Sequence, residues 1–270
     1  MEEHLIKSTT IYFGALFVAW MAHAAPADRE TCFKETGDVA IAACTHLIES
    51  GKFMGTSLAA IYFNRAVTWY DMGDHDRAIQ DYDEAIELNP NFEQAFLNRA
   101  RAYGDKGDFD RAIQDYDRAI KLKPDYAKAF NNRGYIYDEK GDFDRTIQDY
   151  DRAIALKPDY AKAFNNRGIS YAKKGQYDRA IQDYDQAINL EPDYAEALNN
   201  RGGAYSGKRE YDHAIQDYDE AIKLNSNFAQ AFYNRGMAKL KSGDTDGGNA
   251  DIAAAKKINP ALSPDAIIAE

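Results

Sequence analysis

The sequence predicts an all-α fold in which pairs of helices stack into an elongated solenoid. The main observation is a strict internal period of 34 residues, and a period of this length is typical of stacked repeat arrays. The pair Asn-Arg marks the period at Asn64-Arg65, Asn98-Arg99, Asn132-Arg133, Asn166-Arg167, Asn200-Arg201 and Asn234-Arg235. Proline keeps the same spacing at Pro90, Pro124, Pro158, Pro192 and Pro260. One such unit cannot bury its own apolar face, so its neighbours must cover it.

Each period contains two amphipathic helical stretches, which residues 161–194 show most clearly. The apolar stripe of the first stretch is Phe164, Gly168 and Tyr171, and that of the second is Ala180, Tyr184 and Ala187. Gly175 separates the two stretches and Pro192 ends the second, as glycine and proline commonly do at helix ends. Because large aromatic residues face small ones, we expect the two helices to pack closely as an antiparallel hairpin.

Short polar side chains lie where the helices are expected to begin. Asp74, Asp108 and Asp142 each follow a glycine, and a side-chain oxygen at this place can cap the second helix of a period. The same capping role is expected before the first helices for Asn91, Asp125, Asp159, Asp193 and Asn227.

This pattern resembles the tetratricopeptide repeat family, whose first helix carries an aromatic, a small residue and a second aromatic. Here these are Phe96, Ala100 and Tyr103, then Phe130, Gly134 and Tyr137, then Phe164, Gly168 and Tyr171. The family's second helix carries Ala, an aromatic and Ala, matched by Ala112, Tyr116 and Ala119, and closely by Thr146, Tyr150 and Ala153. The resemblance implies a right-handed superhelix of six repeats, at 59–92, 93–126, 127–160, 161–194, 195–228 and 229–262. The sixth repeat departs at Lys239, Gly248 and Ile252, as expected of an end cap, and residues 263–270 form a short tail.

Residues 1–24 have the features of a secretory signal peptide. Ile11 to Ala22 is an unbroken apolar stretch of twelve residues, followed by the cleavage pattern Ala22-His23-Ala24. This stretch is shorter than the about 20 residues of a spanning helix. We expect cleavage before Ala25, with an uncleaved anchor as the alternative. Both place the repeats outside the cytoplasm, in a periplasm or a secreted protein.

Residues 25–58 contain the two cysteines of the chain and are expected to form a degenerate amino-terminal cap repeat. In the 34-residue frame, Cys32 and Cys44 fall where later repeats carry small residues such as Ala66 and Ala78. In the family these two positions form the helix crossing, where the backbones come close enough for a disulfide. We therefore expect a Cys32–Cys44 disulfide, with Gly37-Asp38 in the turn; two buried free thiols are the alternative.

Composition and motifs argue against several function classes. The net charge is −11 and the pI is near 5, so charge argues against nucleic acid and anionic membranes as partners. The histidines share no repeat position and no cysteine pair has zinc spacing, so we expect no catalytic site, no metal and no cofactor. The Asp-Tyr-Asp triplets, such as Asp115-Tyr116-Asp117, are interpreted as solvated residues flanking a core tyrosine.

The six repeated asparagines are the main candidate binding residues. Asn64, Asn98, Asn132, Asn166, Asn200 and Asn234 should point away from the core stripe, on the face that lines the concave surface in the family. An amide can donate and accept at once, so such a row can bind the backbone of an extended peptide. It resembles the asparagine ladder of some long tetratricopeptide proteins. The alternative is that each asparagine bonds a neighbouring helix end, or that the row merely reflects duplication of the repeat.

Charged and variable positions complete the candidate site. The repeated arginines match a second repeated row, Asp81, Asp115, Asp149, Asp183, Asp217 and Asp251, and we expect ion pairs that join helices, with carboxylate binding as the alternative. Arg101, Tyr135 and Lys173 are expected on the concave face beside the asparagines. Other variable positions there are Val67, Ile169, Gly203 and Met237, with Asp71, Asp105, Glu139 and Lys241. Their charge runs from acidic to basic along the chain, which would orient a partner.

The sequence thus predicts a non-enzymatic scaffold that binds a protein or peptide segment. The alternative is a structural or oligomerisation module, or an accessory subunit of an envelope complex, so a homo-oligomer is possible.

Overall fold

The computed structural model describes residues 28–262, and every element in that range is helical. The expected signal peptide and the tail at 263–270 lie outside the described residues. A short helical segment at 28–34 precedes the labelled helices. These are α2 (Gly37–Glu49), α3 (Gly55–Asp71), α4 (His75–Leu88), α5 (Glu93–Asp105), α6 (Phe109–Leu122), α7 (Ala127–Glu139), α8 (Phe143–Leu156), α9 (Ala161–Lys173), α10 (Tyr177–Leu190), α11 (Ala195–Gly207), α12 (Tyr211–Leu224), α13 (Ala229–Ser242) and α14 (Thr245–Ile258).

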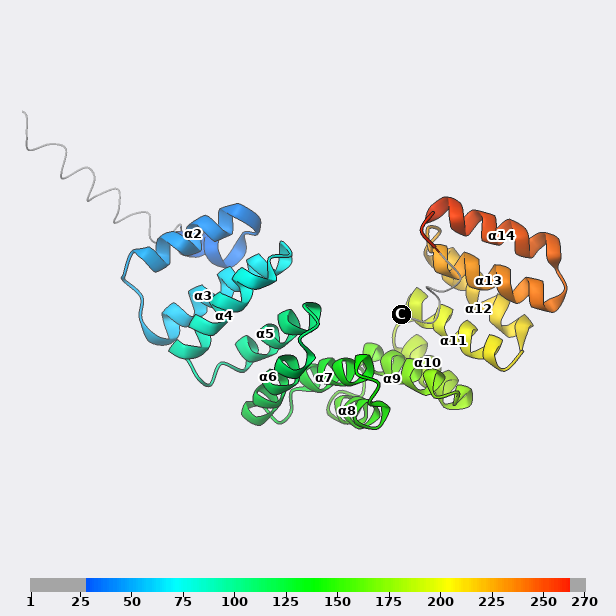
Figure 1. The fold of residues 1–270 in the computed structure, drawn as a ribbon, viewed down its shortest axis with the longest axis horizontal. Coiled ribbons are helices and arrows are strands. Elements are labelled where there is room, and N and C mark those ends of the chain that lie inside the picture. The colour runs from blue at the N-terminus through cyan, green and yellow to red at the C-terminus, as the bar shows by residue number, and fades with distance from the viewer. Residues whose placement is uncertain (1–27, 263–270) are drawn as a thin grey trace, which may run out of the picture. The chain divides into compact units, whose positions relative to one another are not determined.

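The helices pack as consecutive hairpins within two compact units, Met1–Pro124 and Asp125–Glu270. The pairs α3/α4 and α5/α6 belong to the first unit, and the pairs from α7/α8 to α13/α14 belong to the second (Figure 1). Inside each unit, the second helix of a hairpin also packs on the first helix of the next, as α4 does on α5 and α10 on α11. The prediction of an all-α array of helix pairs is confirmed.

In the five hairpins from α3/α4 to α11/α12, a buried tyrosine of the second helix fills the centre of the hairpin. Tyr184 of α10 is 1% exposed and lies against Gly168 of α9. A Cβ atom added at Gly168 would lie 2.7 Å from Cε1 of the Tyr184 ring, which is closer than van der Waals packing allows. Gly202 faces Tyr218 in the same way in the next hairpin. The small residue of the first helix is therefore required by the ring of the second, as the sequence pattern predicted.

The predicted helix caps are confirmed for the second helices and wrong for the first helices. The carboxylates of Asp74, Asp108 and Asp142 each accept a hydrogen bond from the backbone N–H three residues later. The N-cap residues of α5, α7, α9, α11 and α13 are instead aromatic: Phe92, Tyr126, Tyr160, Tyr194 and Phe228. Each of these helices begins one residue later than predicted, so the residue expected to be the cap accepts through its backbone carbonyl, as Asp193 does from the N–H of Ala195.

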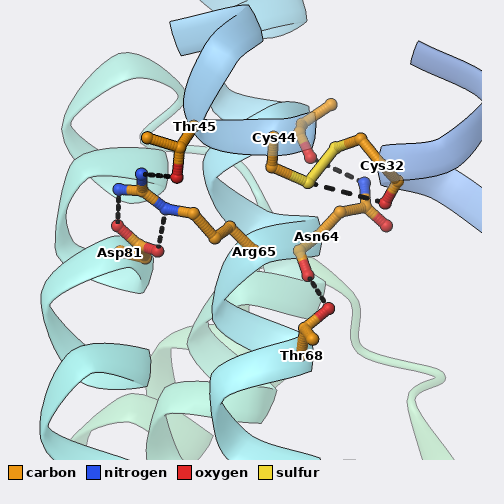
Figure 2. Close-up of a disulfide and its surroundings, with 8 residues drawn as sticks. Cys32, Cys44, Thr45, Asn64, Arg65, Thr68 and Asp81 are labelled. Atoms are coloured by element: carbon orange, nitrogen blue, oxygen red, sulfur yellow. Dashed lines mark hydrogen bonds and ion pairs between the residues drawn. A yellow bond between two sulfur atoms is a disulfide. The ribbon is translucent and has the colours of Figure 1, made fainter. Parts of the chain in front are cut away.

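The amino-terminal cap is closed by the disulfide that the sequence predicted. Cys32, in the segment 28–34, is joined to Cys44 of α2, and their Cα atoms are 4.9 Å apart (Figure 2). Both cysteines are buried, together with Leu47 and Ile61. Figure 2 also shows how α2 meets the first complete hairpin: Nη1 of Arg65 donates to the Thr45 hydroxyl at 2.9 Å. The cap thus contacts α3 through both an apolar cluster and a polar bond.

Candidate functional site

The predicted asparagines all lie on first helices and are all partly exposed, but their contacts differ between the two units. In the first unit, Asn64 donates from Nδ2 to the carbonyl of Ala60 in its own helix, at 2.7 Å. Asn98 hydrogen-bonds the hydroxyl of Tyr82, the buried tyrosine of α4. Neither of these two bonds joins one asparagine to another.

In the second unit, three asparagines each bond to the asparagine 35 residues earlier, which directly precedes the equivalent position of the preceding repeat. Nδ2 of Asn166 donates to Oδ1 of Asn131 at 3.2 Å. The pairs Asn200–Asn165 and Asn234–Asn199 repeat this bond, each at 3.0 Å. Consecutive first helices of this unit are therefore linked by a recurring amide–amide hydrogen bond.

The acceptors Asn131, Asn165 and Asn199 were not among the predicted site residues. Their exposed fractions are 1%, 4% and 7%, so they lie in the protein interior. The sequence did contain a sign of them, because the triplet Asn-Asn-Arg occurs in three successive repeats, at 131–133, 165–167 and 199–201. The bonds of Asn166, Asn200 and Asn234 go to other asparagine side chains and not to helix ends, whereas the alternative that the row reflects duplication of the repeat is not tested by these contacts. Binding of a peptide by the outer row stays a prediction.

The other predicted site residues form two clusters, one in each unit. In the first unit, the Arg101 guanidinium lies 4.6 Å from the centre of the Tyr70 ring, and the Tyr70 hydroxyl bonds Asp105. In the second unit, the Lys173 ammonium lies 2.6 Å from the carboxylate of Asp138.

The charge gradient expected along the concave face is reduced by these contacts. Asp138 is 9% exposed, and it accepts hydrogen bonds from both Lys173 and the Ser170 hydroxyl. The charge of Lys173 is therefore compensated by a neighbouring helix. Tyr135, one turn before Asp138 on α7, differs from these residues because it is 52% exposed. It is the large aromatic side chain that the predicted face presents most openly in the second unit.

The repeated arginines hold helices together, as expected from the two matching rows of opposite charge. Arg167 of α9 binds Asp183 of α10 through two parallel bonds of 2.8 and 2.6 Å. Its third nitrogen binds Asp151 of α8, in the preceding hairpin, at 2.6 Å. Arg201 and Arg235 make the same three bonds in their own repeats. Each of these arginines thus joins three helices.

The arrangement corrects the interpretation of the Asp-Tyr-Asp triplets as solvated flanks. The first aspartate of a triplet is buried, at 5% exposure for Asp183, and the second is more exposed yet bonds the arginine of the next repeat. Burial raises the pKa of Asp183, and the bonds from Arg167 oppose that rise. Burial disfavours the charge of Arg167, but its bonds to Asp183 and Asp151 outweigh this and raise its pKa. Because arginine stays charged throughout the physiological range, Asp183 accepts both bonds from a cation.

Other kinds of site were sought over residues 28–262. No group of His, Cys, Asp and Glu side chains in that range is arranged to hold a metal ion. Within the same range, no helix has the length and apolar character needed to cross a membrane.

The fold and the repeated contacts define a helical-repeat protein, and comparison with known proteins gives its family. A tetratricopeptide repeat family model matches residues 97–161, and a second one matches 59–92, 161–194 and 195–228. Together these matches cover more than half of the chain. The chain belongs to the tetratricopeptide repeat family. Among curated proteins, none matches this sequence.

Several solved structures are similar to this chain. The MamA protein is 28% identical, with a TM-score of 0.55, over 64% of this chain and 94% of that one. YrrB, described as a tetratricopeptide repeat protein with an unusual peptide-binding site, is 22% identical, with a TM-score of 0.53, over 67% and 93%. A tetratricopeptide repeat protein from Parabacteroides merdae is 18% identical, with a TM-score of 0.72, over 91% and 96%. At under 25% identity, the latter two support the fold alone.

Proposed function

We propose that this chain is a non-enzymatic scaffold that binds an extended segment of another protein on the face formed by its first helices. The observation that carries the proposal is the row of partly exposed asparagines on consecutive first helices of the second unit. The amides of Asn166, Asn200 and Asn234 still have donor and acceptor capacity beyond their bonds to the preceding repeat. Repeated amides at near-constant spacing suit a peptide backbone, which offers a donor and an acceptor at each residue.

The surroundings of the row support the same proposal. Tyr135 and Ile169 are partly or well exposed beside Asn132 and Asn166, so they can pack against partner side chains. Aromatic side chains are enriched where proteins bind each other. Arginines of the repeated row are less suited to bind a partner. The guanidinium groups of four of them are each already paired with two aspartates: Arg99, Arg167, Arg201 and Arg235. Binding through carboxylates of the partner is therefore the less favoured mode.

We also propose that the protein acts outside the cytoplasm, in a periplasm or as a secreted protein. The support is the apolar leader in the sequence and the Cys32–Cys44 disulfide, because disulfides persist in oxidising compartments. Amino-terminal sequencing of the exported protein should find Ala25 first. Finding Met1 or Glu2 there would contradict cleavage of the leader.

The binding proposal is tested with a peptide that is selected for binding to the protein. A phage-displayed library of random peptides about 15 residues long, or about 50 Å when extended, is selected against the repeat region, and the enriched sequence is synthesised with a fluorescent label. Replacing Asn166, Asn200 and Asn234 by Ala should weaken binding of this peptide by about one to three decades, because each lost bond contributes about 0.5–1.5 kcal/mol.

A matched control uses another repeated amide of the same unit. Gln148, Gln182 and Gln216 are exposed on the second helices α8, α10 and α12, so their replacement by Ala removes as many amides from a different face. We expect this triple variant to bind like the parent. Equal loss in both triple variants, or a lower melting temperature with unchanged affinity in the asparagine variant, would contradict the proposal. Light scattering on the parent measures its molar mass in solution and shows whether the protein self-associates, as the alternative of an oligomerisation module requires.

A further inference from the structure

We infer that the buried asparagines Asn131, Asn165 and Asn199 position the outer asparagines for binding, and that the backbone-binding row is confined to Asn166, Asn200 and Asn234 in the second unit. This inference rests on the proposed function. It goes further by assigning a role to residues that do not themselves reach the partner. It also shortens the backbone-binding row from six asparagines to the last three.

The first argument is that packing alone would not place asparagine at these buried positions. The equivalent positions of other repeats carry Phe63, Leu97 and Tyr233. Leu97 is 2% exposed and Tyr233 is 6% exposed, so an apolar or aromatic side chain is accommodated there. Burial of an amide costs free energy unless its polar atoms are bonded. Three successive asparagines at an interior site that accepts leucine therefore indicate a requirement other than stability.

The second argument is the direction of the bonds. Asn131, Asn165 and Asn199 each offer Oδ1 to the Nδ2 of the outer asparagine one repeat later. This contact fixes which end of the outer amide is the donor, so Asn166, Asn200 and Asn234 share one orientation. An amide free to flip would present its oxygen and nitrogen in either order. A common orientation lets consecutive amides bind one backbone direction without reordering, which lowers the entropic cost of binding.

The third argument is the hydrogen-bonding capacity that is left. An asparagine side chain has two N–H donors and two acceptor lone pairs. Asn200 uses one N–H on Asn165, and its Oδ1 accepts one bond, from Asn199 at 3.4 Å. Asn234 uses one N–H on Asn199, and its Oδ1 accepts from Gln230 at 3.0 Å. One donor and one acceptor site remain on each, which is the complement of a peptide group.

The first unit lacks this arrangement. Asn64 bonds its own helix and Asn98 bonds a buried tyrosine, and the residues before them are Phe63 and Leu97. The occupant that fits the second unit is therefore an extended polypeptide that binds through its backbone, with little demand on side-chain identity.

The test replaces Asn165 and Asn199 by Leu, the residue that the chain itself carries at position 97. The probe is the labelled peptide selected against the parent repeat region. We expect the double variant to unfold at the same urea concentration as the parent or a higher one, since apolar residues suit this interior site. We expect its affinity for the peptide to fall by about 2- to 12-fold for each position changed. The control Asn98→Ala should bind the peptide like the parent.

The outcomes separate this inference from the proposed function. If the asparagine triple variant of the outer row binds like the parent, or if no peptide is selected, the proposed function fails and this inference fails with it. If the triple variant loses affinity while the leucine variant keeps it, only the positioning role is wrong. Loss of stability in the leucine variant would show that the buried asparagines serve the fold. Weakened binding in Asn98→Ala would show that the row extends into the first unit.

Discussion

Two adjacent glycines of α11 should respond in opposite ways to the same substitution. A Cβ atom added at Gly202 would lie 2.7 Å from Cε1 and 3.0 Å from Cζ of Tyr218, which is 2% exposed. The Tyr218 ring cannot easily move, because it is packed with Ala214 and Ala238. At Gly203, by contrast, no atom lies within 4 Å of an added Cβ. The two positions thus share one helix but differ in the room available for an added side chain.

Gly202→Leu should destabilise the protein. Overpacking of a core costs about 1–3 kcal/mol, and the gain in helix propensity on leaving glycine returns at most about 1 kcal/mol. Gly203→Leu keeps that gain without the clash, so it should stabilise by about 0.5–1 kcal/mol. The two variants have the same composition, which makes each the control for the other.

The assay is urea unfolding followed by helical circular dichroism, with midpoints compared at one temperature. Gly202→Leu is expected to unfold at a lower urea concentration than the parent, and Gly203→Leu at an equal or higher one. A parent-like midpoint for Gly202→Leu would refute the close approach of α11 and α12 at this point. Equal shifts in both variants would refute the assignment of one glycine to the helix crossing and the other to the open face.

Three further predictions follow from local contacts. Reduction of the Cys32–Cys44 disulfide opens a loop of about 13 residues and should destabilise the amino-terminal cap by at most about 3 kcal/mol. The melting temperature should fall when a reductant is added to the parent, whereas the reductant should not change the melting temperature of a double Cys→Ala variant. Hydrogen bonds from the side chain and backbone N–H of Arg111 lower the pKa of Asp108. The stabilisation by this cap should therefore be present above about pH 4 and be lost as the pH falls through the folded-state pKa. The melting-temperature difference between the parent and Asp108→Ala should then vanish in acid, and a difference that persists would contradict the cap. Arg209 has φ 65° where other turns carry glycine, so Arg209→Gly should raise the stability by about 0.5–1 kcal/mol, and a lower urea midpoint would contradict strain at this turn.

The sequence predicted the parts of this fold that depend on local spacing. The 34-residue period, the aromatic and small residues of each hairpin and the caps at Asp74, Asp108 and Asp142 all follow from patterns within one repeat. The disulfide was predictable because the period placed both cysteines at the helix crossing.

Features that depend on contacts between repeats were harder to predict. Asn165 and Asn199 were not among the predicted site residues, since their burial depends on how the next first helix packs against them. The carboxylate of Asp185 was expected to be solvated, and its bond to Arg201 of the next repeat could not be predicted from the pattern of one repeat. The pairing of Lys173 with Asp138 likewise joins different repeats, so single-helix periodicity could not show that its charge is compensated.

The most direct test of the central claim is to locate the bound peptide on the surface. A photo-reactive benzoylphenylalanine is placed at Tyr135 on the first-helix face or at Gln182 on a second helix, and each protein is irradiated with the selected labelled peptide. Both positions are well exposed, so both side chains can react with a bound molecule. The account predicts a cross-linked product from position 135, competed by unlabelled peptide, and none from position 182. A product from position 182 without one from position 135 would contradict binding on the first-helix face.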